Sequence, residues 1–222
     1  MPLSPSPSNM TIDSCYWRSS PISNAKPTSI ELPKTKRGRS TRTAILAAAE
    51  NVIGAHGFSA ASIAEITREA GIAQGTFYIY FEGKEQVFRE LVYEMGRLTR
   101  ENLAEAVAGA TDRLSAERRG VLAFLKFVRG RPSLYAIVEE ARFVDLEAYR
   151  AYYTEFATAY AQNLKAAQAR GEIRPGDADT RAWALMGMAK ALGERFALWE
   201  PDAPLEPLVE DVLDMIEHGL AP

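Results

Sequence analysis

The stretch from Ser62 to Lys84, SIAEITREAGIAQGTFYIYFEGK, constrains the fold of this chain more than any other. Ser62 is a favourable N-cap, because its hydroxyl can accept a hydrogen bond from a free amide in the first turn of a helix. Gly71 is expected to end that helix, since glycine adopts a positive φ without a Cβ clash. A second short helix is expected to begin near Gln74. Two short helices joined by a tight glycine turn predict a helix-turn-helix.

The second short helix is expected to leave a polar face exposed. Phe77 and Phe81 are four residues apart and turn towards the core, so the groups that turn outward are those of Gln74, Gly75, Thr76, Tyr78 and Tyr80. This face carries little charge and suits contacts with base edges in a DNA major groove. Lys84 follows where a third helix should start, in a position suited to a phosphate contact. The alternative is that both helices are ordinary core pieces, which fits poorly with polar groups gathered on one side.

Charge is distributed unevenly along the chain. The 222 residues carry a formal net charge of −3, which argues against a protein that coats nucleic acid non-specifically. A run of basic residues without an acid nevertheless precedes the helix-turn-helix: Lys34, Lys36, Arg37, Arg39 and Arg42. We interpret residues 34–39 as a basic arm that follows phosphates or the minor groove, or else as a solvated tail.

The run GIAQGTFYIYFEGKEQVF resembles the signature of the TetR family of bacterial transcription regulators. The likeness extends upstream through SIAEITREA to a helix that we expect to be capped by Ser40 or Thr41, with Arg42 and Thr43 in its first turn near a phosphate. Family members usually have Ser and a basic residue where this chain has Ala73 and Gln74, so Gln74 is a candidate base reader. The residues assigned to DNA contact are Arg42, Thr43, Ser62, Ala73, Gln74, Gly75, Thr76, Tyr78, Ile79, Tyr80 and Lys84.

Three segments are expected in an all-α chain. Residues 1–33 hold six of the twelve prolines and few large apolar side chains, so they are predicted to be disordered. Residues 34–83 form the helix-turn-helix DNA-binding domain. Residues 84–222 form a larger helical bundle for ligand binding and dimerisation, with helix breaks near Gly130 to Pro132, 141–145, 171–177 and Pro201 to Pro204.

The last two helices carry more apolar surface than one chain is expected to cover. The small residues Ala184, Gly187 and Ala191 allow a second helix to approach closely, which predicts a homodimer through a four-helix contact. The resemblance implies the same pairing. Two helix-turn-helix units related by a two-fold axis would read a palindromic double-stranded DNA operator, with half-sites about 34–36 Å apart. The alternative is that this surface is internal core.

Aromatic residues gather between residues 120 and 200. We interpret ten side chains there as walls of a site for a large apolar or aromatic effector: Phe124, Phe127, Tyr135, Phe143, Tyr149, Tyr152, Tyr153, Phe156, Trp183 and Met186. The segment VEEARFVDLEAYRAYYTEFATAY resembles regulators that sense acyl-coenzyme A thioesters such as phenylacetyl-coenzyme A, and Arg142 and Arg150 would then face phosphates. Core packing explains each aromatic residue as well, and ion pairs with nearby glutamates explain each arginine.

The sequence therefore predicts a ligand-responsive, homodimeric transcription regulator, expected to be a repressor. Two alternatives stay open: a TetR-like regulator of an efflux or stress gene that senses a drug-like compound, and a DNA-binding dimer without a ligand. An enzyme is not expected, nor a cofactor or metal, because His56 and His218 lie in unrelated places and no metal-ligand spacing or phosphate loop occurs.

Two further features indicate the compartment. Cys15 is the only cysteine, so a disulfide within the chain is impossible and a reducing cytoplasm is expected. No run of about eighteen apolar residues is present, so no membrane span is expected.

Overall fold

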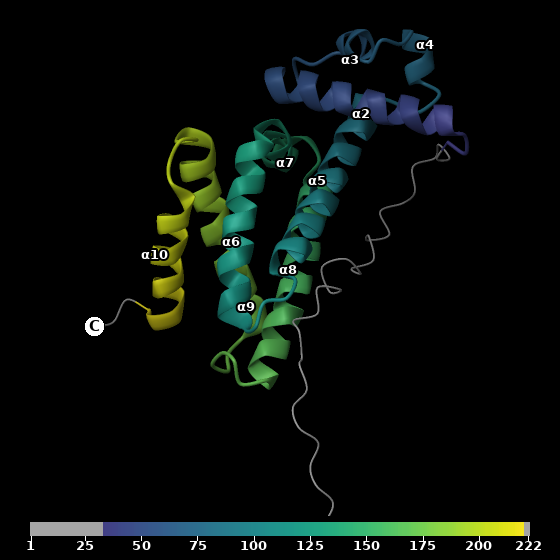
Figure 1. Ribbon diagram of the computed structural model, residues 1–222. Helices are drawn as coiled ribbons and strands as arrows, with labels where there is room; N and C mark the ends of the chain where they lie inside the picture. The colour runs from purple at the N-terminus through teal and green to yellow at the C-terminus, as the bar shows by residue number, and fades with distance from the viewer. Residues whose placement is uncertain (1–32, 220–222) are drawn as a thin grey trace, which may run out of the picture. The chain divides into compact units, whose positions relative to one another are not determined.

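The computed structural model describes residues 33–219, and all regular elements in that range are helical (Figure 1). The predicted all-α fold is confirmed. The predicted disorder of residues 1–33 lies, except for Pro33, outside the described residues. In chain order the elements are α2 (Lys36–His56), α3 (Ile63–Glu69), α4 (Gln74–Phe77), α5 (Lys84–Val107), α6 (Arg113–Gly130), α7 (Pro132–Val144), α8 (Leu146–Ala169), α9 (Ala178–Leu192), the π-helix η1 (Gly193–Trp199) and α10 (Leu205–His218).

The described residues group into two compact units. The N-terminal unit comprises residues 33–98 and 130–156, and the C-terminal unit comprises residues 99–129 and 157–219. The division falls within α5 and within α8, so each of these helices contributes to both units. The functional boundary expected between residues 83 and 84 stays a prediction.

The helix α2 begins earlier than the sequence analysis predicted. Thr35 Oγ1 accepts a hydrogen bond from the Gly38 amide at 3.0 Å and caps the helix at Lys36. The start expected at residues 40–41 is wrong, and so is an extended basic arm over residues 34–39. Lysine and arginine are good helix formers, so a capped run of them continues as helix even without a buried face.

The core of the N-terminal unit forms where α2, α3, α4 and α5 meet. Phe58, from the turn after α2, lies edge-on to Phe88 of α5, with ring centroids 5.0 Å apart. Burying one such side chain stabilises the fold by roughly 1.5–3 kcal/mol relative to leaving it exposed. The largest fully buried side chains of this unit include Ile45, Ile53, Ile66, Phe77, Phe81, Phe88 and Leu91.

In the C-terminal unit, α10 packs antiparallel along α6. Leu125 of α6 is buried against Leu205, Val209 and Leu213 of α10. Two ion pairs join the same helices at opposite ends of the contact: Arg118 with Glu210 at 3.0 Å and Lys126 with Glu206 at 2.8 Å. The apolar side of the last helix, which was expected to exceed what one chain can cover, is thus largely buried within the chain.

The helix break after α9 differs from a simple stop. The chain continues into η1, and the Arg129 guanidinium on α6 donates to the carbonyls of Phe196 and Ala203 at 2.8 Å each. This side chain holds the wider turn of the π-helix and the loop that follows it. In residues 33–219, no helix is both long and apolar enough to cross a membrane.

Candidate functional site

The helix α3 begins with a capping box. Ser62 Oγ accepts a hydrogen bond from the Glu65 amide at 3.2 Å, and the Glu65 carboxylate accepts from the Ser62 amide at 3.0 Å. Hydrogen bonds from the Ser62 hydroxyl and then from its amide hold the pKa of Glu65 below its ordinary value. Ser62 was predicted to contact DNA, but its hydroxyl is engaged at the start of its own helix.

The turn between α3 and α4 depends on Gly71. Its φ is +66°, a conformation that other residues rarely adopt, while no atom would obstruct a Cβ there. The Ile72 amide donates to the Thr67 carbonyl at 3.0 Å, which closes the end of α3. α4 then begins at Gln74, so the predicted helix-turn-helix is confirmed.

The outer face of α4 and the following turn is the candidate DNA-reading surface. Phe77 is fully buried, whereas Tyr78 is 50% exposed and Ile79 66% exposed. Ala73, Gln74 and Gly75 are exposed as well, while Thr76 and Tyr80 are half-buried. An exposed glutamine can bind adenine through two hydrogen bonds, and an exposed apolar side chain can contact a thymine methyl group. The face thus combines an amide with apolar surface.

Arg42 is held inside the N-terminal unit. Its Nη2 lies 2.9 Å from Glu90 Oε2 of α5, and its guanidinium lies 5.1 Å from the ring centroid of Phe81. Because α2 starts at Lys36, Arg42 is not in the first turn, and that expectation is wrong. Thr43, predicted beside it, is exposed.

Lys84 also binds groups of its own chain. It opens α5 as predicted, but its Nζ donates to the carbonyls of Phe58 and Ala61 at 2.5 and 2.6 Å. The ammonium lies 4.3 Å from the ring centroid of Phe58. Instead of being free for a phosphate, Lys84 has partners in the turn between α2 and α3.

The same turn is held from α7 by a carboxylate. Both Glu140 oxygens accept from the Phe58 amide, at 2.8 and 2.9 Å. Near the other end of α7, Ser133 approaches Gly54 of α2 so closely that a Cβ on Gly54 would lie 2.4 Å from the Ser133 Cβ. We name the turn of residues 57–61 with its two charged partners, Lys84 and Glu140, the turn clamp. It fixes the turn that leads into α3.

The ten residues predicted to line an effector site are divided between the two units. Tyr135, Phe143, Tyr149, Tyr152, Tyr153 and Phe156 belong to the N-terminal unit, and Phe124, Phe127, Trp183 and Met186 to the C-terminal unit. Phe143 is 87% exposed, so its assignment to an interior wall is wrong. Position 143 lies at the end of α7, where the helix turns its side chain away from the core. Trp183 on α9 is 45% exposed.

Three of the predicted tyrosines form an aromatic cluster on α8. The rings of Tyr149 and Tyr152 each lie edge-on to Tyr153, with centroids 4.8 and 4.9 Å away. The Tyr153 hydroxyl donates to Glu139 at 2.7 Å. Burial, and then the Glu139 charge, raise the pKa of Tyr153, so this hydroxyl stays a proton donor at every physiological pH.

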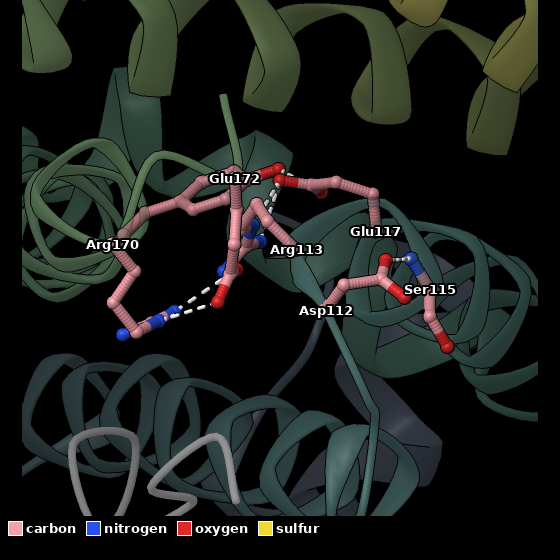
Figure 2. Close-up of polar contacts among 7 residues, drawn as sticks. Asp112, Arg113, Ser115, Glu117, Arg170 and Glu172 are labelled. Carbon is pink, nitrogen blue, oxygen red and sulfur yellow. Dashed lines mark hydrogen bonds and ion pairs between the residues drawn. The ribbon is translucent and has the colours of Figure 1, made fainter. Parts of the chain in front are cut away.

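A buried polar cluster in the C-terminal unit was not predicted. Glu117 Oε1 accepts from Arg113 Nε at 2.8 Å and from Nη2 at 2.5 Å (Figure 2). Glu117 Oε2 accepts from the Tyr160 hydroxyl at 2.5 Å. All three side chains are buried. Burial, and then the Glu117 charge, raise the pKa of Tyr160 well above its ordinary value. The sequence shows Arg113 and Glu117 at i, i+4 spacing, which permits an ion pair. It holds no signal for Tyr160, which only the packing of the helices brings to Glu117.

Asn163 lies one helical turn beyond Tyr160 on α8. Its side chain is buried, with 7% of the residue exposed, and its Nδ2 has no hydrogen-bond partner. Asn102 on α5 has a buried Oδ1 that is also unpaired. Within residues 33–219, no group of three His, Cys, Asp or Glu side chains could hold a metal ion.

Sequence comparison identifies the helix-turn-helix. Residues 45–91 match the family described as bacterial regulatory proteins, tetR family, a range that spans most of α2, the helix-turn-helix and the start of α5. Over 191 residues the chain is 29% identical to the HTH-type transcriptional regulator YdgC of Bacillus subtilis, covering 84% of this chain and 95% of YdgC. Over residues 45–91 the chain thus carries a helix-turn-helix of the tetR type. The protein is a DNA-binding transcription regulator, and its relatives are regulators rather than enzymes.

Solved structures share the fold of this regulator. FadR from Bacillus subtilis, in complex with stearoyl-CoA, is 20% identical with a TM-score of 0.64, and the match covers 81% of this chain and 99% of FadR. AibR, in complex with isovaleryl coenzyme A and operator DNA, is also 20% identical with a TM-score of 0.64, covering 79% of this chain and 97% of AibR.

Proposed function

We propose that this regulator is a homodimeric repressor that leaves a palindromic operator when it binds an acyl-CoA effector. The observation that supports the proposal is the exposed face of α4 and the following turn, where Gln74, Tyr78 and Ile79 flank a fully buried Phe77. Exposed apolar side chains on so short an element need a partner surface, and a DNA major groove offers both base edges and thymine methyl groups.

Positive charge lies beside this face. A Cβ on Gly38 would lie 3.7 Å from the Tyr80 hydroxyl, so the first turn of α2 adjoins the end of the α4 segment. That turn carries exposed Lys36, Arg37 and Arg39. We assign phosphate contact to these exposed side chains and to Thr43, because Arg42 and Lys84 are half-buried and paired within the chain. Arg39 donates to the Lys34 carbonyl at 2.7 Å but stays exposed. Gln74 is the proposed base reader.

The proposed dimer uses the exposed side of α9. Trp183, Gly187 and Ala191 are spaced four residues apart and all are exposed, and Trp199 of η1 is 66% exposed. Large exposed tryptophans beside small residues favour close contact with a second helix. A second copy of the same surface would bury these residues around a two-fold axis. The two helix-turn-helix units of the dimer would then match two half-sites of an operator.

The proposed effector class follows from the acyl-CoA found in the FadR and AibR structures. Release from DNA is a linkage effect, because an effector that binds one conformation more tightly than another lowers operator affinity by the ratio of the two binding constants. The operator lies on the chromosome, so we place the regulator in the cytoplasm.

Fluorescence anisotropy tests the proposal. The full chain is titrated onto a palindrome from the DNA that flanks its gene, without effector and then with acyl-CoA thioesters of several chain lengths, phenylacetyl-CoA and free coenzyme A. Release by a thioester and not by free coenzyme A is the expected result. If only a drug-like compound reverses tight binding, the effector is a compound of that kind and not an acyl-CoA. Tight binding that no ligand reverses would favour a ligand-independent DNA-binding dimer.

A further inference from the structure

The side-chain amide of Asn163 has the features of a ligand contact. Asn163 is 7% exposed, and its Nδ2 has no hydrogen-bond partner although the residue lies in a regular helix. A buried donor without a partner is destabilising, because it has lost its hydrogen bonds to water and gained none in the protein. Leucine or alanine would fill such a position without that cost, so the amide suits a ligand atom rather than the fold.

The side chains on the same face of α8 define what this donor can bind. Tyr160, Asn163 and Ala167 recur at helical spacing, and all three are buried. The Tyr160 hydroxyl already donates to Glu117 Oε2, so it is not free to donate to a ligand. Asn163 Nδ2 is thus the donor that this face offers to an acceptor.

The charge of the neighbouring cluster selects a neutral acceptor. Arg113 pairs with Glu117 through two hydrogen bonds, so the cluster is polar without net charge. A free carboxylate next to it would be buried beside Glu117 without a cation of its own, which is costly. A carbonyl oxygen carries no such cost and accepts from an amide N–H with ordinary geometry.

We propose that Asn163 Nδ2 donates a hydrogen bond to the thioester carbonyl oxygen of the effector. The inference rests on the proposed acyl-CoA response and adds the residue that would distinguish an acyl thioester from a molecule with the same chain and no carbonyl. Asn163 is a specificity-determining residue in this view, and the cluster of Arg113, Glu117 and Tyr160 positions the helix face that carries it.

The test compares two ligands of equal chain length, an acyl-CoA and the S-alkyl-CoA thioether that lacks the carbonyl oxygen. Direct binding to the full chain is measured by calorimetry. The wild-type protein should bind the thioester more tightly by about 2- to 12-fold, the range expected for one neutral hydrogen bond. Asn163→Leu should bind both ligands with equal affinity. Asn102→Leu, which removes the other asparagine that has a buried, unpaired side-chain atom, should keep the wild-type preference.

Stability provides a second readout. Because Asn163→Leu removes an unpaired buried donor, the unfolding midpoint of the ligand-free variant should be no lower than that of the wild type. A much lower midpoint would mean that the amide serves the fold and would overturn the proposal. Equal binding of thioester and thioether by the wild-type protein would also overturn it, while leaving the acyl-CoA response intact. If neither ligand binds, the proposed effector class itself fails, and the role of Asn163 fails with it.

Discussion

The N-terminal and C-terminal units use charged side chains in different ways. In the turn clamp, Lys84 and Glu140 bind main-chain carbonyls and an amide of the turn after α2. In the C-terminal unit, Glu117 binds only side chains, those of Arg113 and Tyr160. A bond to the main chain fixes the course of the backbone, whereas a network of side chains can change partners while the helices stay in place. A fixed backbone suits a helix-turn-helix that contacts DNA, and a network that can change partners suits a helical bundle that binds a ligand.

Removing Glu117 should have the largest effect on the fold. Glu117→Ala leaves Arg113 buried without its carboxylate, and we expect the free energy of unfolding to fall by about 3–5 kcal/mol. Urea unfolding at one fixed protein concentration measures it, since dimerisation makes apparent stability depend on concentration. The double variant Arg113→Met with Glu117→Leu is the control and should recover most of the loss. A loss below about 1 kcal/mol in the single variant would contradict a buried, coupled pair.

Breaking the turn clamp should affect DNA binding as well as stability. Glu140→Ala removes both acceptors of the Phe58 amide, which should cost about 1.5–3 kcal/mol of unfolding free energy. Operator affinity should fall in parallel, because the turn leads directly into the helix-turn-helix. Glu140→Gln retains one acceptor oxygen and should lose less of both. If Glu140→Ala bound the operator as the wild type does, the clamp would be a local contact without a role in positioning.

A substitution of Gln74 tests the exposed face of α4 without changing the turn clamp. Gln74→Ala should leave the unfolding curve unchanged, since the side chain is exposed. The variant's preference for one base pair of each half-site should fall by about 1–3 kcal/mol, measured by anisotropy on operators changed at single positions. A uniform loss across all operator variants would instead assign Gln74 to a phosphate.

The cap of α3 should contribute less. Ser62→Ala removes the hydroxyl of the capping box and should destabilise the chain by about 1 kcal/mol. Ser62→Thr keeps the acceptor and serves as the matched control. Thermal unfolding measured by circular dichroism distinguishes the two. Equal midpoints for Ser62→Ala and the wild type would mean that the cap bond has no net effect on stability.

The smallest effect is expected at the ion pair between Arg89 and Asp145, whose atoms lie 2.6 Å apart. Burial tends to raise the pKa of Asp145, but the Ala148 amide and the Arg89 guanidinium outweigh it and hold the pKa below its ordinary value. A lowered pKa adds stability above the unfolded value of about 3.9, and this is lost as pH falls through the folded value. Arg89→Ala should cost about 0.2–1 kcal/mol at neutral pH. The difference from the wild type should shrink on acidification, and a constant difference would contradict this linkage.

Features that depend on a few neighbouring residues were predictable. The Ser62 cap, the Gly71 turn, the start of α4 at Gln74 and the start of α5 at Lys84 all follow from local backbone chemistry, and the structure has each of them. The start of α2 was missed because Thr35 competes with residues 40–41 as a cap. All are favourable N-cap residues, and nothing local distinguishes them.

Features that depend on distant residues were not predictable. Arg42 and Lys84 looked like free cations in the sequence, and only the packing of α5 and the turn of residues 57–61 gives them partners. Phe143 looked like a core aromatic, but its exposure depends on where α7 ends relative to its neighbours.

The sequence by itself determined the helical fold, the helix-turn-helix and the polar face around Phe77, because these are set by caps, glycine conformation and helical spacing. Only the tertiary structure decided that Glu140 reaches the Phe58 amide, that Tyr160 joins Arg113 and Glu117, and that Asn163 is buried with an unpaired donor. The first two contacts join residues 82 and 43 positions apart. At such separations the burial and partners of a polar side chain depend on how helices pack, which no local pattern encodes.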